Sequence, residues 1–173
     1  IESLLFVRDE HLKDNIFSVM IEPMQCEGGD KYSSSRFHNN LLIMLRSFRV
    51  PLIYDEVQTG FHLGRDFFWH RQFSLKDENG VDMHPDYIIC AKKAQAGMVI
   101  AKKKQELFFE EEFSTASLIR GYHHAMFMDQ SSGRIIKLES MVRDELKKLM
   151  KNHSDHIESP RCTGVSFAID LKN

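Results

Sequence analysis

The sequence predicts an α/β fold built on a mostly parallel sheet. Two short, mostly apolar runs at residues 16–21 and 52–54 have the length and composition of buried strands, and a helical pattern lies between them. Strand, helix and strand joined by short connections form a βαβ unit, in which the strands run parallel with a right-handed crossover. A third strand at 87–90 extends the pattern, and 173 residues are enough for a domain with a hydrophobic core.

The first half of the chain supplies this βαβ unit. The first strand is expected at Ile16–Ile21, because the apolar run ends at Glu22-Pro23. Three serines at 33–35 can cap the helix that follows. Pro51 ends this helix, since the residue before a proline is pushed out of the helical conformation. The apolar residues of the helix recur at helical spacing: Phe37, Leu41, Met44, Leu45 and Phe48.

The second half is less regular. The strand at 87–90 follows His84-Pro85, and a further apolar run lies at 98–101. Residues 108–130 show no clear pattern. A long amphipathic helix is expected from about Ser132 to Asn152, and an alternating strand at 165–171 closes the chain. The apolar residues of that helix are Ile135, Leu138, Val142, Leu146 and Leu149.

The composition excludes several classes of function. With 42% hydrophobic and 28% charged residues the chain is typical of a globular protein, and its formal charge of −2 gives no electrostatic case for nucleic-acid binding. No apolar run approaches the roughly 20 residues of a membrane span. Three widely spaced cysteines argue against disulfides and structural zinc, so we expect a cytoplasmic protein. His123 and His124 have no partner at metal-ligand spacing, so no metal site is expected and both should be exposed.

Distinctive residues follow all three predicted strands. Glu22–Gly29 reads EPMQCEGG, Asp55–Gly60 reads DEVQTG, and Ala91–Gln95 reads AKKAQ. In open parallel sheets, ligands bind at the carboxyl ends of the strands. An aspartate and a lysine on neighbouring strand ends suit pyridoxal 5'-phosphate, which needs a lysine amine for covalent attachment and a carboxylate beside its pyridine nitrogen. By spacing alone, chance placement of Asp55 and Lys93 is the more frequent explanation of such a pair.

The residues in these segments resemble the class III (ω) aminotransferases, which use pyridoxal phosphate. The first motif, at 22–29, and the second, at 52–60, resemble the pair of motifs that marks this family. Pro85-Asp86, a strand and then Lys93 resemble the third landmark. The resemblance is strongest from about Ile16 to Ala101.

The resemblance implies a particular fold and domain organisation. It partly returns at Arg161–Gly164 and Phe167–Asp170, which resemble the entry to the small domain of the family. The expected fold is therefore the fold type I of pyridoxal-phosphate-dependent transferases. Residues 1–130 are expected to be part of the large cofactor-binding domain, and 131–173 the connecting helix and the start of the C-terminal small domain.

The detailed motifs point to one branch of the family. Three features resemble the lysine ε-aminotransferases: the segment Lys92–Gln95, Asp30 and the segment Phe68–Phe73. This implies a homodimer that moves the terminal amino group of lysine, or of a similar ω-amine, to 2-oxoglutarate. The doubled lysine also resembles 4-aminobutyrate aminotransferases, so another class III activity is an alternative. A truncated or degenerate homologue without catalysis is a further alternative.

The resemblance also implies roles for single residues at the site. Asp55 pairs with the pyridine nitrogen, Val57 packs on the ring, and Gln58 bonds the phenolic oxygen. Lys93 binds the cofactor covalently and moves a proton between the substrate carbon and the cofactor. Lys92 is the alternative lysine.

Two more residues are implied outside the ring site. Glu27 matches a glutamate at the substrate entrance, although it could be an ordinary loop acid. Thr115 matches a threonine that reaches the phosphate across the dimer interface, although it could be a helix cap.

The sequence departs from the family in places. Cys26 replaces a usual glycine, and Ala116–Leu118 replace an aromatic residue and two glycines. The phosphate cradle and the arginine for the substrate carboxylate cannot be placed in this chain. We therefore expect it to be a central fragment that is inactive and holds the cofactor weakly by itself.

Overall fold

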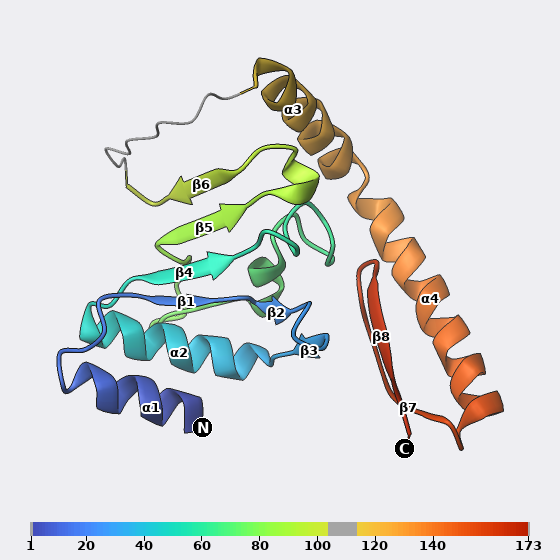
Figure 1. The fold of residues 1–173 in the computed structure, drawn as a ribbon, viewed down its shortest axis with the longest axis horizontal. Helices are drawn as coiled ribbons and strands as arrows, with labels where there is room; N and C mark the ends of the chain where they lie inside the picture. Colours follow the sequence, from blue (N-terminus) through green and yellow to red (C-terminus); the bar gives the residue numbers. More distant parts are fainter. Residues whose placement is uncertain (1, 104–113, 173) are drawn as a thin grey trace.

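A four-stranded sheet lies at the centre of the N-terminal part of the molecule (Figure 1). The computed structural model describes residues 2–103 and 114–172. The strand order is β1-β4-β5-β6, in which β1, β4 and β5 run parallel and β6 runs antiparallel to β5. The predicted mostly parallel sheet is therefore confirmed. The strands are β1 (Val19–Ile21), β4 (Leu52–Asp55), β5 (Tyr87–Cys90) and β6 (Met98–Ala101).

The crossover between β1 and β4 is helix α2 (Ser35–Phe48), as the sequence predicts. The Ser34 side chain caps it by accepting the Phe37 N–H at 3.2 Å, and Arg49 ends it in the left-handed conformation with φ of 58°. Burial of its apolar stripe against β4 stabilises the helix. The main core contains Leu41, Leu42 and Leu45 of α2 together with Leu52 and Tyr54 of β4.

Helix α1 (Glu2–His11) was not predicted, and strand β1 is shorter than predicted. α1 packs against α2, where the His11 and Phe48 rings stack with centroids 4.2 Å apart. The expected strand start at Ile16 is wrong, because β1 begins at Val19, which pairs with Leu52. Pro51 precedes the partner strand β4, so the residues before Val19 have no strand to pair with, and Phe17 is exposed.

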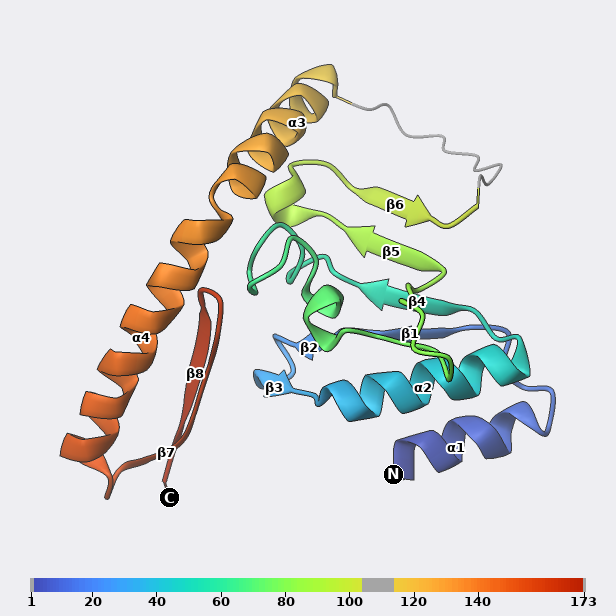
Figure 2. The ribbon, with the colours of Figure 1, turned by 180° about the vertical axis from the view of Figure 1, so that it is seen from behind.

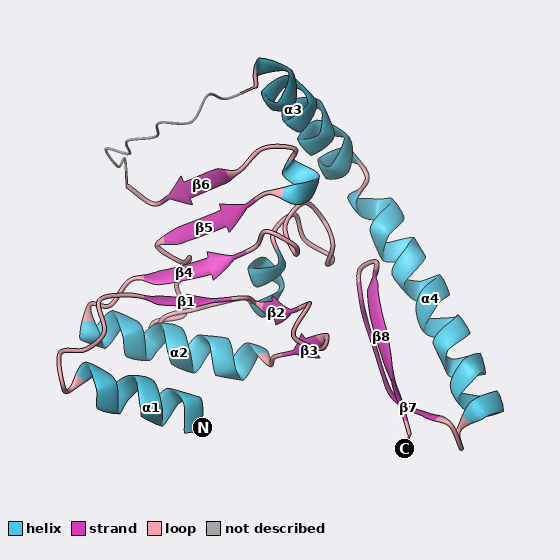
Figure 3. Ribbon diagram, in the orientation of Figure 1, coloured by secondary structure: helices cyan, strands magenta, loops and turns pink. Residues whose placement is uncertain are grey.

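Short elements shape the segments at the carboxyl edge of the sheet. After β1, strands β2 (Met24–Gln25) and β3 (Lys31–Tyr32) form a small antiparallel hairpin. The 3₁₀ helix η1 (Trp69–Phe73) follows the long loop after β4, and the 3₁₀ turn η2 (Lys92–Ala94) follows β5 directly. Figure 3 distinguishes these elements by type.

The C-terminal part consists of two helices and a hairpin. Helix α3 (Thr115–Gln130) and helix α4 (Ser132–His153) are separated by Ser131, and the predicted helix at 132–152 is confirmed. Strands β7 (Ile157–Thr163) and β8 (Ser166–Leu171) form an antiparallel hairpin along α4, as Figure 2 also shows from behind. The closing strand is confirmed, whereas β7 and α3 were not predicted. No helix in the described ranges is long and apolar enough to cross a membrane.

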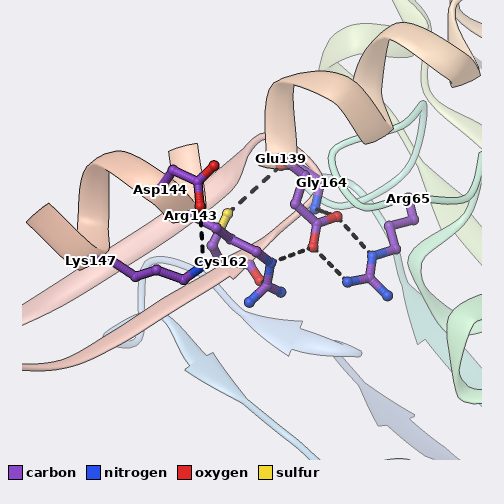
Figure 4. Close-up of polar contacts among 7 residues, drawn as sticks. All are labelled: Arg65, Glu139, Arg143, Asp144, Lys147, Cys162 and Gly164. Carbon is purple, nitrogen blue, oxygen red and sulfur yellow. Dashed lines mark hydrogen bonds and ion pairs between the residues drawn. The ribbon is translucent and has the colours of Figure 1, made fainter. Parts of the chain in front are cut away.

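A buried carboxylate joins the hairpin, α4 and the loop after β4 (Figure 4). Both oxygens of Glu139 accept from Arg65, at 2.6 and 2.7 Å, and Arg143 Nε donates to it at 2.8 Å. The backbone N–H of Gly164, at the hairpin tip, donates to it at 2.9 Å. Burial acts to raise the pKa of Glu139, but the hydrogen bonds from Arg65, Gly164 and Arg143 outweigh it and lower the pKa to about 2.

Gly164 lets the tip of the β7–β8 hairpin lie close to the backbone of the loop after β4. Its φ is +62°, and a Cβ there would clash with the backbone of Leu63 and Gly64. The next residue, Val165, donates its N–H to the Leu63 carbonyl at 3.0 Å. The hairpin is therefore fixed to the same loop that leads away from β4.

Candidate active site

The segments that follow β1, β4 and β5 meet at the carboxyl edge of the sheet. β4 lies between β1 and β5, and Asp55, the last residue of β4, is paired with Ile89 of β5. The Glu56 N–H donates to the Ile89 carbonyl at 2.8 Å. Lys93 follows four residues after Ile89, in the turn η2. Asp55 and Lys93 therefore come from the ends of neighbouring parallel strands.

The carboxylate of Asp55 is held in a fixed orientation by the backbone. Asp55 is half-buried, and its Oδ1 accepts the N–H of Val57 at 3.0 Å. Within residues 2–103 and 114–172 the structure gives its other oxygen no hydrogen-bond donor. A protonated pyridine nitrogen would suit that oxygen. Val57 and Gln58, which follow, are also half-buried at this edge.

The two neighbouring lysines have different surroundings. Lys93 is half-buried, and burial lowers its pKa to about 8, against the opposite effects of Cys26 and Glu56. A lysine with a pKa near 8 is partly neutral at ordinary pH and can act as a nucleophile. Lys92 is exposed, and its Nζ donates a short hydrogen bond to Gln58 Oε1. The structure thus buries Lys93 but joins Lys92, not Lys93, to Gln58.

Glu56 is a structural residue of the site to which the sequence analysis gave no role. Its carboxylate is fully buried, and each oxygen accepts two hydrogen bonds. Oε2 accepts from Thr59 Oγ1 and from the Trp69 N–H, both at 2.8 Å. Oε1 accepts from the N–H of His70 at 2.9 Å and from its Nδ1 at 2.8 Å. Glu56 therefore fixes the loop between β4 and η1, and has no oxygen left for a ligand.

A chain of hydrogen bonds that runs from the surface into the core supports β4 from the α2 side. Ser33 Oγ donates to the Pro23 carbonyl at 2.9 Å, so His38 Nε2 must donate to Ser33 Oγ, 2.6 Å away. His38 Nδ1 then accepts from the Tyr54 hydroxyl at 2.8 Å. Burial lowers the pKa of His38 to about 4 and raises the pKa of Tyr54. These residues are neutral and connect the loop after β1 to the strand that ends at Asp55.

Glu27 and Cys26 lie in the turn after β2. Glu27 is exposed, and the turn is closed by the Gly29 and Asp30 N–H groups, both of which donate to the Cys26 carbonyl at 3.0 Å. Burial raises the pKa of the Cys26 thiol to about 11, helped by Glu22 and opposed by Lys92. The turn therefore lies beside the two lysines, with Glu27 at its outer side.

Thr115 is placed apart from the other predicted site residues. It is exposed at the start of α3 and makes no hydrogen bond to them in the described parts of the chain. The helix cap is Ser114, whose side chain accepts the Ser117 N–H at 3.4 Å, so the alternative of Thr115 as the cap is wrong. A phosphate contact from Thr115 across a dimer interface stays a prediction.

Comparison with known proteins identifies the family. The family model described as "Aminotransferase class-III" matches residues 1–173. The chain belongs to the class III aminotransferase family. Among curated class III relatives, a probable mitochondrial 4-aminobutyrate aminotransferase from Caenorhabditis elegans is 33% identical over 170 residues, covering 92% of this chain and 34% of that protein. A mitochondrial acetylornithine aminotransferase from Debaryomyces hansenii is 28% identical, covering 92% and 36%.

Solved structures share the fold of this class III chain. A lysine aminotransferase from M. tuberculosis superposes with a TM-score of 0.80 at 22% identity, covering 97% of this chain and 40% of that one. An ornithine δ-aminotransferase from Plasmodium falciparum gives 0.78 at 18% identity, covering 98% and 45%. The partial fold type I domain is thereby confirmed. The chain spans less than half the length of these proteins, so the activity of the whole protein is a matter for proposal.

Proposed function

We propose that the complete protein is a pyridoxal-phosphate-dependent aminotransferase for which this chain supplies the lysine and the ring-binding edge. The observation that carries the proposal is the placing of Asp55 and Lys93 at the carboxyl ends of the adjacent parallel strands β4 and β5. The family match over the whole chain supports it.

The residues present fit the cofactor. Asp55 offers a fixed carboxylate with one oxygen directed by Val57 and the other without a donor among the described residues. Lys93 offers a half-buried amine with a lowered pKa. Gln58 offers a side-chain amide beside them, whose oxygen Lys92 already contacts. The phosphate has only Thr115 as a proposed ligand in this chain.

Each residue then has a stated task in the reaction. When bound, pyridoxal phosphate supplies a protonated ring that accepts electrons from the substrate carbon. The Asp55 carboxylate keeps the ring nitrogen protonated, and Gln58 bonds the phenolic oxygen. The Lys93 amine would hold the cofactor covalently and, once displaced by the substrate amine, would move the proton from the substrate carbon to the cofactor. Glu56 keeps the loop that carries Val57 and Gln58 in place.

For the substrates, we propose a terminal amine as the donor and 2-oxoglutarate as the acceptor, with lysine as the preferred donor. The motif at Lys92–Gln95, which resembles that of the lysine ε-aminotransferases, supports lysine. The 33% identity to a probable 4-aminobutyrate aminotransferase supports 4-aminobutyrate as the second candidate. Exposed Glu27 is proposed to act at the entrance for both substrates.

The experiment is to measure glutamate formation by the complete, cofactor-loaded protein with lysine, ornithine or 4-aminobutyrate as donor. We expect lysine to give the largest kcat/KM, and Lys93→Ala to abolish both the reaction and the visible absorbance of the bound cofactor. Retained absorbance in Lys93→Ala would move the covalent role to Lys92. Absence of bound cofactor in the wild-type protein would favour the non-catalytic homologue.

The predicted assembly and compartment remain proposals of the same kind. A homodimer is proposed because Thr115 is assigned to a phosphate on a partner subunit, and size-exclusion chromatography with light scattering tests it. The three free cysteines fit the proposed cytoplasmic location.

A further inference from the structure

Helix α3 packs against the turn that carries the two lysines (Figure 1). The His124 Nδ1–H donates a short hydrogen bond to the backbone carbonyl of Lys93. One turn earlier, Gly121 is buried, and a Cβ there would clash with the carbonyl oxygen of Ala94. Ala125 packs against the small core cluster that contains Ala94. The helix therefore touches both peptide groups that follow the Lys93 side chain.

The two histidines of α3 have different surroundings, and only His124 makes this contact. His123 is exposed, as the sequence predicts. His124 is half-buried against η2, so its predicted exposure is wrong. Local sequence could not reveal the difference, because the partner of His124 lies 31 residues earlier in the chain.

The turn needs an external contact because its own conformation is unfavourable. Lys92 has φ of +51° and Gln95 has φ of +61°, the left-handed region that side chains other than glycine rarely adopt. Its internal bonds are Ala94 N–H to the Ala91 carbonyl at 3.0 Å and Gln95 N–H to the Lys92 carbonyl at 2.9 Å. Neither bond uses the Lys93 carbonyl, which His124 fixes.

The orientation of this turn decides which of two adjacent lysines is buried. We propose that His124, brought close by Gly121, is a positioning residue that selects Lys93 over Lys92 as the cofactor-binding lysine. The inference rests on the proposed function, in which one of these lysines binds pyridoxal phosphate. Without the imidazole donor the Lys93 peptide is free to rotate, and its side chain becomes exposed like that of Lys92.

The titration of Lys93 reports this positioning without any assay of activity. Its pKa is lowered to about 8 chiefly by burial, while Cys26 and Glu56 oppose the shift. Loss of burial should raise the pKa towards the ordinary lysine value of 10.5. Acetylation of the cofactor-free protein over a pH series, followed by fragment-ion mass spectrometry, measures Lys92 and Lys93 separately.

A matched set of variants in the complete protein isolates the hydrogen bond. His124→Leu removes the donor, His124→Asn has nearly the same shape as leucine but keeps an N–H, and His123→Leu changes the exposed neighbour. We expect His124→Leu to raise the Lys93 midpoint by about one pH unit or more, and to raise Lys92 labelling relative to Lys93 several-fold. His124→Asn and His123→Leu should stay close to the wild type.

A second readout identifies the lysine that carries the cofactor. Borohydride reduction of the loaded protein followed by peptide mapping should place the cofactor on Lys93 in the wild type and partly on Lys92 in His124→Leu. If His124→Leu does not fold, Gly121→Ala carries the same expectation, because its added methyl group pushes α3 away from Ala94.

Two negative outcomes can be told apart. Unchanged Lys93 titration and labelling ratio in His124→Leu, or in Gly121→Ala where that is the folded variant, would overturn the role of His124 whatever the protein catalyses. Cofactor found on Lys92 in the wild type would overturn both the assignment of Lys93 and its selection by His124. Cofactor on neither lysine would overturn the proposed function. The titration of Lys93 would then still show whether His124 keeps this lysine half-buried.

Discussion

At the scale of single residues, the adjacent acids Asp55 and Glu56 have different surroundings and hence different tasks. Successive residues of a strand point to opposite faces, so the two carboxylates separate at the end of β4. Asp55 keeps one oxygen without a described donor, whereas Glu56 is fully buried and saturated with four hydrogen bonds. One acid is therefore available for chemistry and the other for structure.

Replacing Asp55 tests the proposed chemistry. In Asp55→Asn the amide keeps its oxygen for the Val57 N–H but loses the charge, so the protein should fold and bind cofactor. We expect kcat to fall by a factor of roughly 100 or more, because the lost charge acts where the substrate carbon develops negative charge. Single-turnover kinetics at matched cofactor content measure this. A rate within a few-fold of wild type would show that Asp55 does not pair with the ring nitrogen.

Replacing Glu56 tests the structural role. In Glu56→Gln the amide nitrogen must face groups that are themselves donors, so at least one buried N–H loses its acceptor. We expect the free energy of unfolding to fall by about 2 kcal/mol. Urea denaturation measures it, with Glu27→Gln as the same chemical change at an exposed site. Equal losses in the two variants would contradict the buried role.

At the scale of elements, the contact between α2 and β4 depends on a polar group inside an apolar interface. His38 is fully buried and stacks on Phe73 with centroids 3.9 Å apart, while its nitrogens bond Ser33 and Tyr54. Such a group stabilises the interface while it is neutral, because burial disfavours the charged imidazolium.

The pH dependence of stability follows from this. The pKa of His38 is about 4 in the folded protein and near 6.5 in the unfolded chain, so below pH 6.5 only the unfolded state takes up the proton. The contribution of neutral His38 to the free energy of unfolding should be fully present above pH 6.5. It should fall by about 3 kcal/mol between pH 6.5 and 4. Urea denaturation at half-unit pH steps tests this. The dependence of the free energy of unfolding on pH between 6.5 and 4 should become weaker in His38→Asn and stay unchanged in His123→Asn. Equal pH dependence in the two variants would contradict the role of His38.

At the scale of the whole molecule, Glu139 connects the C-terminal helix and hairpin to the N-terminal sheet. Its partner Arg65 lies 74 residues earlier, and Gly164 lies 25 residues later. Further contacts reach the hairpin from the small β2–β3 hairpin, where the Tyr32 hydroxyl lies 2.8 Å from Ser166 Oγ. The position of the C-terminal part is thus determined by specific polar contacts.

Removing the Glu139 charge should loosen this junction. Glu139→Gln is expected to lower the free energy of unfolding by about 2 kcal/mol, a modest value because both arginines are about half exposed. Cleavage of the β7–β8 hairpin by limited proteolysis should also become faster. Glu145→Gln, on an exposed position of the same helix, is the control. Since the pKa of Glu139 is about 2 in the folded protein and the ordinary value for a glutamate is 4.5, this contribution should be present above pH 4.5 and lost as the pH falls towards 2.

The sequence by itself determined the elements whose signals are local. The stripe of α2, the short runs of β4 and β5, and the periodicity of α4 each describe a surface that must be buried, and all four were found close to their predicted places. The residues of the three motifs also indicated the family. Helix α1 was not predicted because its sequence has little amphipathic pattern, and the structure buries none of its residues fully.

Only the tertiary structure decided which residues act together. Glu56, His124 and Glu139 are unremarkable in sequence, and each gains its role from partners 13 to 74 residues away. No periodic pattern encodes such pairings, because a hydrogen bond depends on where two distant segments meet in space. The sequence put Asp55 and the lysines at the ends of neighbouring strands, but only the structure shows that Lys93 is half-buried, with α3 packed on its turn, and that Lys92 is exposed.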